Sequence, residues 1–271
     1  MGTAAEESPQ QASGHSPHLL ESIPRAVGRN RLGLKGELPF AGEDIWNAYE
    51  LSWLDTGGRP MVATGEFRVP ANSPNIVESK SLKLYLNSLN GCRYDSPNAV
   101  RSTIAADLGR VCGAGAQVRL HSSSSSVAPP QGEPVGRCID AAELGTPKYD
   151  LHPEILRDSA DPQSRVAETL HSNLLKTNCP VTGQPDWATV MVRYRGPRIR
   201  REALLAYLIS YRNHAEFHEQ CVERMFMDIK RFCRPQALSV YARYLRRGGL
   251  DINPFRSNFE TPPPNVRLLR Q

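Results

Sequence analysis

The strongest constraint on the fold is that the order of apolar patterns in the first half of the chain recurs in the second half. In each half, two segments with alternating apolar residues precede two with the spacing of an amphipathic helix, and another strand-like segment follows. In the first half these segments are residues 45–53, 60–69, 79–90, 97–111 and 117–120. In the second half they are residues 170–176, 187–195, 200–213, 218–233 and 238–244. This repeat predicts an internal structural duplication.

The repeated order predicts an α+β protein in which each half is an antiparallel sheet with two helices packed on one face. Residues 145–164 are rich in Asp and Pro and have little periodicity, and the five serines from residue 122 predict a loop. The predicted parts are an N-terminal tail at 1–40, flexible over at least 1–17, an N-terminal module at 41–145, a linker at 146–164 and a C-terminal module at 165–271.

Composition excludes several classes of protein. Hydrophobic residues make up 39% and charged residues 23% of the chain, as in globular proteins, and no apolar run is long enough to span a membrane. The net charge of +5 is modest for 271 residues, so direct binding to nucleic acid is not expected. Six cysteines without a CxxC pair, and without a secretory signal, indicate free thiols in the cytoplasm.

Cys179 is the first candidate for chemistry. It lies in a loop between two predicted strands, with the sequence Asn-Cys-Pro-Val-Thr-Gly-Gln-Pro-Asp at 178–186. Stiff, exposed loops of this kind often carry catalytic groups, and Asp186 could exchange a proton beside the thiol. A lone cysteine is more often a small buried apolar residue, so the loop alone leaves both interpretations open.

His218 and Glu219 form the second candidate because they open a predicted helix, where a carboxylate is stabilised by the exposed amides. A glutamate at a helix start is also common for purely structural reasons. Cys221 lies close by, so a zinc site formed by Cys179, His218 and Cys221 is an alternative, since a catalytic zinc needs only three protein ligands.

Two further segments are suited to anionic or polar ligands. Glu78, Ser79 and Lys80 lie at the start of the predicted helix at 79–90, where backbone amides can bind phosphate oxygens. After the strand at 238–244 come arginines beside two glycines, which permit close backbone approach to an anion. The residues concerned are Arg243, Arg246, Arg247, Gly248 and Gly249. Each segment could equally be a solvated helix start or a surface turn.

These segments together resemble the motifs of the NADPH-dependent 7-cyano-7-deazaguanine reductases, the nitrile reductases of queuosine biosynthesis. Glu-Ser-Lys-Ser-Leu-Lys-Leu-Tyr at 78–85 is similar to their signature, and Asn-Cys-Pro-Val-Thr-Gly-Gln-Pro-Asp-Trp at 178–187 to their catalytic loop. The segments Glu-Phe-His-Glu-Gln-Cys-Val-Glu at 216–223 and Tyr-Ala-Arg-Tyr-Leu-Arg-Arg-Gly-Gly-Leu-Asp-Ile-Asn-Pro at 241–254 also match. The resemblance runs from about residue 32 to the end of the chain and leaves out the serine run.

The resemblance implies two tandem tunnelling-fold modules, related to GTP cyclohydrolase I, that assemble as a homodimer or larger ring. It also implies catalytic roles for Cys179, which would add to the nitrile carbon as a covalent thioimidate, and for Asp186, which would protonate the nitrile nitrogen. Glu78 and Glu219 would accept hydrogen bonds from the guanine-like ring. The other substrate-binding residues that it implies are Val77, Ser79 and His218.

NADPH is the implied co-substrate, two molecules per turnover, and no metal is implied. Ser79, Lys80, Arg247 and Gly248 would hold it. A nitrile accepts hydride poorly, and addition of a thiolate converts it to a polarised C=N bond that hydride can attack. Because Glu78 belongs to the first half and Cys179 to the second, the pocket is expected between modules or between subunits.

Two alternatives remain. A hydrolase on the same fold, similar to the cyclohydrolases, would use the three zinc ligands named above and would be inhibited by chelators. A catalytically silent module that binds purines or RNA would keep its function without the Cys179 thiol and would consume no NADPH. Neither alternative explains why all four motifs occur together.

Overall fold

The computed structural model describes residues 14–122 and 131–271. The first half contains two long strands, two helices and a closing strand, in the predicted order. These are β2 (Ala41–Leu54), β3 (Pro60–Pro70), α2 (Ser79–Ser88), α3 (Pro97–Cys112) and β5 (Gln117–Ser122). The rest of the serine run, residues 123–126, lies outside the described part.

The second half repeats this order and adds a strand. Its elements are β8 (Ala160–Asn178), β9 (Pro185–Ile199), α4 (Arg201–Ile209), α5 (His218–Cys233), β10 (Ala237–Tyr244) and β11 (Leu250–Ser257). The shorter elements are η1 (Pro17–Leu19), β1 (Ser22–Pro24), α1 (Arg25–Arg31), β4 (Asn75–Val77), η2 (Leu89–Gly91), β6 (Gln131–Gly132), β7 (Arg137–Cys138), η3 (Pro153–Leu156), η4 (Ser210–Asn213) and β12 (Arg267–Leu268).

Both halves contribute to one sheet, so the expectation that each half has a sheet of its own is wrong. The eight strands follow the order β5, β3, β2, β11, β10, β9, β8, β7, and all neighbours except β7 and β8 are antiparallel. The halves meet where β11 pairs with β2, from Leu250 opposite Ala48 to Ser257 opposite Ala41. The sequence patterns did not identify β11, because four buried polar residues and a proline interrupt its apolar pattern. The α+β class is as predicted.

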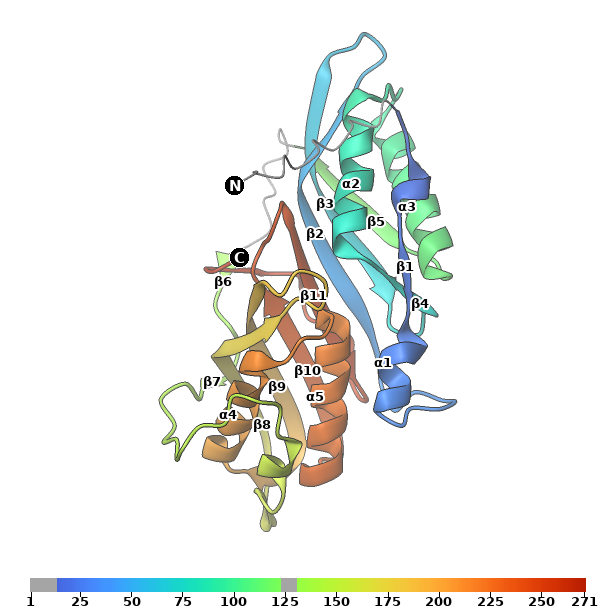
Figure 1. Cartoon of the computed structure of the whole chain (residues 1–271). Helices are drawn as coiled ribbons and strands as arrows, with labels where there is room; N and C mark the ends of the chain where they lie inside the picture. Colours follow the sequence, from blue (N-terminus) through green and yellow to red (C-terminus); the bar gives the residue numbers. More distant parts are fainter. Residues whose placement is uncertain (1–13, 123–130) are drawn as a thin grey trace, which may run out of the picture.

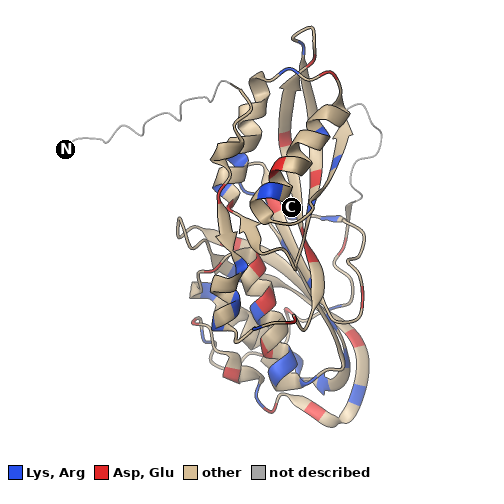
Figure 2. Cartoon of the chain, turned by 90° about the vertical axis from the view of Figure 1, so that its right-hand side faces the viewer, with Lys and Arg blue, Asp and Glu red and all other residues tan. Residues whose placement is uncertain are grey.

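Each half has one apolar core between the sheet and its helices. In Figure 1, α2 and α3 of the first half lie next to each other against β2, β3 and β5. The core of the first half includes Trp46 and Tyr85, and that of the second half Tyr194 and Phe226. Within residues 14–122 and 131–271, no helix combines the length and the apolar character needed to cross a membrane. Basic and acidic residues are intermingled on the side seen in Figure 2.

The predicted boundaries need two corrections. The linker predicted at 146–164 ends earlier, because β8 starts at Ala160 and pairs with β9. The segment predicted as a tail at 1–40 contains η1, β1 and α1 in its described part, and His15 Nε2 lies 2.6 Å from Asp107 Oδ2. Most of the stretch predicted to be flexible, residues 1–13, lies outside the description.

A buried charge network explains why this N-terminal segment is ordered. Arg25 of α1 pairs with Asp44 of β2, and Arg29 Nη2 lies 2.7 Å from Glu223 Oε1 of α5. Arg256 of β11 bridges the two carboxylates, with contacts of 2.8 Å to Asp44 and 3.0 Å to Glu223. Burial raises the pKa of Asp44, but Arg25 and Arg256 more than offset this and leave it below its ordinary value. The network therefore joins α1 to both halves.

Replacing Arg25 with methionine is expected to lower the free energy of unfolding by about 3 kcal/mol, because Asp44 would keep its buried charge with one partner fewer. Urea denaturation monitored by circular dichroism would measure the loss. The exposed Lys35 on the same segment provides the matched control, Lys35→Met, which should change stability little. Equal stability of the two variants would contradict a structural role for the network.

Candidate active site

The loop that carries Cys179 is a tight turn between the long strands β8 and β9. The Cys179 amide donates to the Gln184 carbonyl at 2.8 Å, and the Gly183 amide donates to the Cys179 carbonyl at 2.9 Å. Gly183 has a φ of +70°, a conformation that only glycine adopts readily. The turn closes on itself and keeps the Cys179 side chain 7% exposed, while Val181 at its tip is 60% exposed.

The surroundings of Cys179 favour its thiolate. Burial raises the pKa of the thiol, but hydrogen bonds from the Thr182 hydroxyl and amide, the Arg247 guanidinium and the Val181 amide more than offset burial. The pKa therefore lies below its ordinary value. A thiolate, not a thiol, is the nucleophile, so this cysteine is prepared for addition to an electrophile. Neither Thr182 nor this use of Arg247 was predicted from the sequence.

Replacing Thr182 with valine is expected to raise the pKa of Cys179 and slow its alkylation by iodoacetamide at pH 7 by about fivefold, because the thiolate loses its hydroxyl donor. The variant should approach the wild-type rate only at higher pH. Mass spectrometry of the peptide that carries Cys179 separates this thiol from the other five. The exposed Thr261→Val is the control, and identical rate–pH profiles for Thr182→Val and wild type would contradict the assigned hydrogen bond.

Asp186 lies at the start of β9 and contacts two residues distant from it in sequence. Its Oδ2 atom is 3.2 Å from His218 Nε2, at the first residue of α5, and its Oδ1 atom is 3.3 Å from Arg247 Nη1. The same Arg247 nitrogen donates to Gln184 Oε1 at 3.1 Å. Arg247 thus contacts both Asp186 and the loop of Cys179, which places the predicted nucleophile and the predicted proton donor in one constellation.

A small cavity of about 20 Å³ brings most of the predicted substrate and catalytic residues together. Its lining includes Val77, Ser79, Cys179, Asp186, His218, Glu219 and Arg247. It also includes residues that were not predicted: Trp46, Pro180, Glu216, Phe217 and Ile252. Apolar wall residues such as Trp46 follow the same sequence pattern as core residues, so the sequence offered no signal for them. Glu216 and Phe217 lie inside the motif at 216–223, which was the signal that could have identified them.

This cavity lies between the halves of one chain, because Trp46, Val77 and Ser79 belong to the first half and Cys179 and Asp186 to the second. Its volume holds little more than a water molecule. A second cavity of about 190 Å³ shares five of its residues: Ser79, Asp186, His218, Arg247 and Ile252. A base can enter only if side chains move or the two spaces merge.

The second cavity contains the predicted cofactor residues Ser79, Lys80, Arg247 and Gly248. Lys83, one turn further along α2, also lines it, and its Nζ atom lies 2.9 Å from where a Cβ on Gly248 would stand. Gly248 also has a φ of +62°. A side chain at this position would be strained and would collide with Lys83, so the glycine keeps the backbone open beside three cationic groups.

Glu78 is the predicted residue that the two cavities do not include. Its carboxylate accepts a hydrogen bond from the Ser81 amide at 2.6 Å and so caps α2. The Ser79 hydroxyl lies 3.4 Å from Glu78 Oε1, which keeps the carboxylate near the cavity wall. Its predicted bond to the substrate remains a prediction.

Glu219, in the first turn of α5, is 3% exposed. Burial raises its pKa to about 8, and the charge of Asp44 in the network described above adds to this. Both effects favour the protonated form of the carboxyl group before any ligand is bound. In the protonated form its carbonyl oxygen can still accept a hydrogen bond from the substrate, and its hydroxyl can donate one.

The zinc ligands of the alternative hydrolase are not brought together. Within the described ranges, the group of three possible ligand atoms within 4.8 Å of one another consists of His214, Glu216 and Cys221. Arg224 binds both oxygens of Glu216, at 2.6 and 3.0 Å, and His214 lies 2.9 Å from it. Burial and the Glu216 charge hold the pKa of Cys221 well above its ordinary value. A neutral thiol beside a carboxylate that is paired with an arginine is typical of a loop held by ion pairs. Here these contacts support the start of α5.

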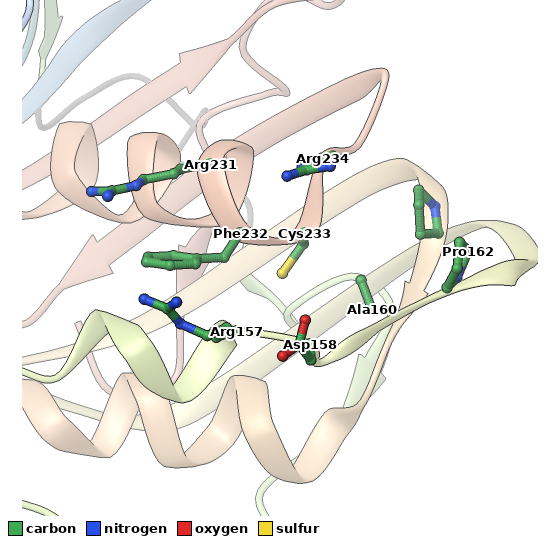
Figure 3. Close-up of a pocket in the computed structure, with 9 residues that line it drawn as sticks. Arg157, Asp158, Ala160, Pro162, Arg231, Phe232, Cys233 and Arg234 are labelled. Carbon is green, nitrogen blue, oxygen red and sulfur yellow. The ribbon is translucent and has the colours of Figure 1, made fainter.

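A larger cavity of about 710 Å³ contains none of the predicted residues. It lies at the far end of α5, where Arg157 and Arg231 lie on either side of Phe232 and Arg234 lies further along the cavity wall (Figure 3). Arg157 pairs there with Glu154, and both Arg157 and Arg231 stand over the Phe232 ring. Arginines at the C-terminal end of a helix are stabilised by its dipole, which accounts for their position without a ligand.

Comparisons with known proteins agree with the motifs. The family described as "Nitrile reductase, 7-cyano-7-deazaguanine-reductase N-term" matches residues 12–120, and the family described as "QueF-like protein" matches residues 185–263. The NADPH-dependent 7-cyano-7-deazaguanine reductase of Hydrogenovibrio crunogenus is 52% identical over 258 residues, 95% of this chain and 92% of that protein. The reductase of the same name from Dechloromonas aromatica is 52% identical over 261 residues, 96% of this chain and 92% of that protein.

A solved structure of the archaeosine synthase QueF-Like in the apo form aligns with 36% of this chain and 97% of its own, at 21% identity and a TM-score of 0.31, which is too low to support any statement on the fold. The two relatives are similar over almost their whole length and carry one name. Their similarity, together with the two family matches, shows that this chain belongs to the family of NADPH-dependent 7-cyano-7-deazaguanine reductases.

Proposed function

We propose that this protein reduces the nitrile of 7-cyano-7-deazaguanine to the aminomethyl group with two molecules of NADPH, as a step of queuosine biosynthesis in the cytoplasm. The observation that carries the proposal is the constellation around Cys179. A thiol whose pKa is lowered stands in one cavity with Asp186, and residues of both halves close that cavity. Covalent addition to a nitrile needs a nucleophile and a proton donor in this arrangement.

In the first step, Cys179 Sγ forms a bond to the nitrile carbon and the nitrile nitrogen takes up the proton that the thiol has lost. Asp186 carries this proton, because its carboxylate is held in the cavity by His218 and Arg247. The product is a thioimidate joined to Cys179. Thr182 and Arg247 stabilise the thiolate both before the addition and when it leaves again.

NADPH supplies a hydride for each of the two reductions. The thioimidate carbon accepts the first hydride and its nitrogen a proton. The resulting hemithioaminal expels the Cys179 thiolate, which takes back a proton from the nitrogen, and an imine is left. The imine carbon accepts the second hydride and the nitrogen a second proton, which gives the primary amine. The imine must stay bound while the cofactor is exchanged, and a site closed by residues from both halves favours its retention.

The residues of the 190 Å³ cavity fit a phosphate-bearing cofactor. Lys80, Lys83 and Arg247 supply positive charge, Ser79 supplies a hydroxyl, and Gly248 leaves room for close approach of the backbone. The deazaguanine ring would lie against Trp46, Phe217 and Ile252, with Val77 beside it and Glu219 and Glu78 as hydrogen-bond partners.

We further propose that the two halves, residues 41–145 and 165–271, are tandem tunnelling-fold modules that share the one sheet, with β2 of the first half beside β11 of the second. The protein would act as a homodimer without a metal. Size-exclusion chromatography with light scattering tests the dimer, and a monomer at micromolar concentration would exclude it.

The proposed reaction is tested by mixing the protein with 7-cyano-7-deazaguanine and NADPH and following cofactor absorbance. Two molecules of NADPH should be consumed per substrate molecule, and none without substrate. Preincubation with a chelator should leave the rate unchanged. Consumption of one NADPH per substrate molecule would contradict the proposed two-step reduction. Loss of activity with the chelator would contradict the proposal and favour the metal-dependent alternative.

A further inference from the structure

Tyr244, the last residue of β10, stacks on the imidazole of His218. The ring centroids are 3.7 Å apart and the planes differ by 6°. Tyr244 is completely buried, and its backbone pairs with Ala188 of β9, the strand that begins beside Asp186. Its carbonyl oxygen accepts a hydrogen bond from Gln271 Nε2 at 2.9 Å. The phenol ring is therefore held by the sheet itself.

The His218 ring needs such support. A histidine that handles protons is usually oriented by a hydrogen bond at the nitrogen that does not face its partner. In His218 Nε2 faces Asp186 at 3.2 Å, and Nδ1 is buried without a hydrogen-bond partner among the described residues. Rotation of the imidazole would break its contact with Asp186. The flat contact with Tyr244 keeps the imidazole in one plane and so opposes this rotation.

We propose that Tyr244 is a positioning residue for the reaction, which acts through His218 to hold the Asp186 carboxylate in place for proton transfer. The inference rests on the proposed function of Asp186. The ring of Tyr244 is the part that matters, because Tyr244 lines neither cavity of the candidate active site and its hydroxyl lies near Thr177 and Cys221. Tyr244 belongs to the matching segment at 241–254, but the motif does not indicate that it stacks on His218.

Tyr244→Met tests the proposal, since it keeps much of the apolar volume and removes the flat ring. We expect kcat to fall about tenfold with little change in KM, and the rate of covalent adduct formation without NADPH to fall in parallel. Tyr244→Phe, which keeps the ring, should restore both rates to within about twofold of wild type. Thermal unfolding shows that each variant is folded at the assay temperature, and Tyr244→Leu replaces the methionine variant if that variant is not.

A double-mutant cycle separates positioning from general support of the fold. In a His218→Ala background, Tyr244→Met should have no further effect on kcat if Tyr244 acts through His218. An equal loss in both backgrounds, a wild-type rate for Tyr244→Met, or a phenylalanine variant as slow as the methionine variant would each overturn the proposal. The wild-type protein in the same assay tests the proposed function independently. An inactive wild type would contradict the proposed reaction, but not the positioning of His218 by Tyr244.

Discussion

The Cys179→Ala variant should form no covalent adduct with 7-cyano-7-deazaguanine and should consume NADPH at least about 10⁴-fold more slowly than wild type, because loss of a nucleophile removes the whole covalent pathway. The adduct is detected by intact-protein mass spectrometry without NADPH, and cofactor consumption by absorbance. Substrate should still bind, since the walls of the cavity and the carboxyl of Glu219 remain.

The matched control for this variant is Cys138→Ala. Cys138 is exposed and lines neither of the two cavities of the candidate active site, so this variant should keep the adduct and the rate of wild type. Substantial NADPH consumption by Cys179→Ala, or an adduct located on another cysteine, would refute covalent catalysis by Cys179.

The Asp186→Asn variant should bind substrate normally and form the adduct about 10²- to 10³-fold more slowly, because an amide cannot carry the proton from the thiol to the nitrile nitrogen. The amide also loses the charge that faces His218 and Arg247. Rapid mixing without NADPH isolates the addition step, and equilibrium binding to the Cys179→Ala/Asp186→Asn double variant measures affinity without chemistry.

Asp158→Asn is the control for this charge change. Asp158 is exposed, lines the cavity at the far end of α5 and has a φ of +55°, a conformation that asparagine also adopts readily. It should leave the addition rate unchanged. An Asp186→Asn variant that adds to the nitrile at the wild-type rate would mean that the proton reaches the nitrogen by another route, with His218 the next group to test.

Local sequence patterns predicted the main elements well because each depends on contacts within its own segment. The apolar spacing of α5 matched residues 218–233, and the serine and proline at 96 and 97 marked the start of α3, where the Ser96 hydroxyl accepts a hydrogen bond from the Ala99 amide. The segments predicted less well owe their structure to distant partners. Residues 160–164 become a strand through β9, and α1 is ordered by Asp44 and Glu223.

The sequence by itself determined the α+β class, the repeated order of elements, the family and the residues most suited to the chemistry, because periodicity and motifs are properties of short segments. Only the tertiary structure decided that β11 joins the two halves into one sheet, that Thr182 and Arg247 stabilise the Cys179 thiolate, and that Tyr244 stacks on His218, which contacts Asp186. These features depend on contacts between residues that lie far apart along the chain or on the closure of a turn. Burial and direction of hydrogen bonds, which set the pKa of Cys179, exist only once the strands have paired.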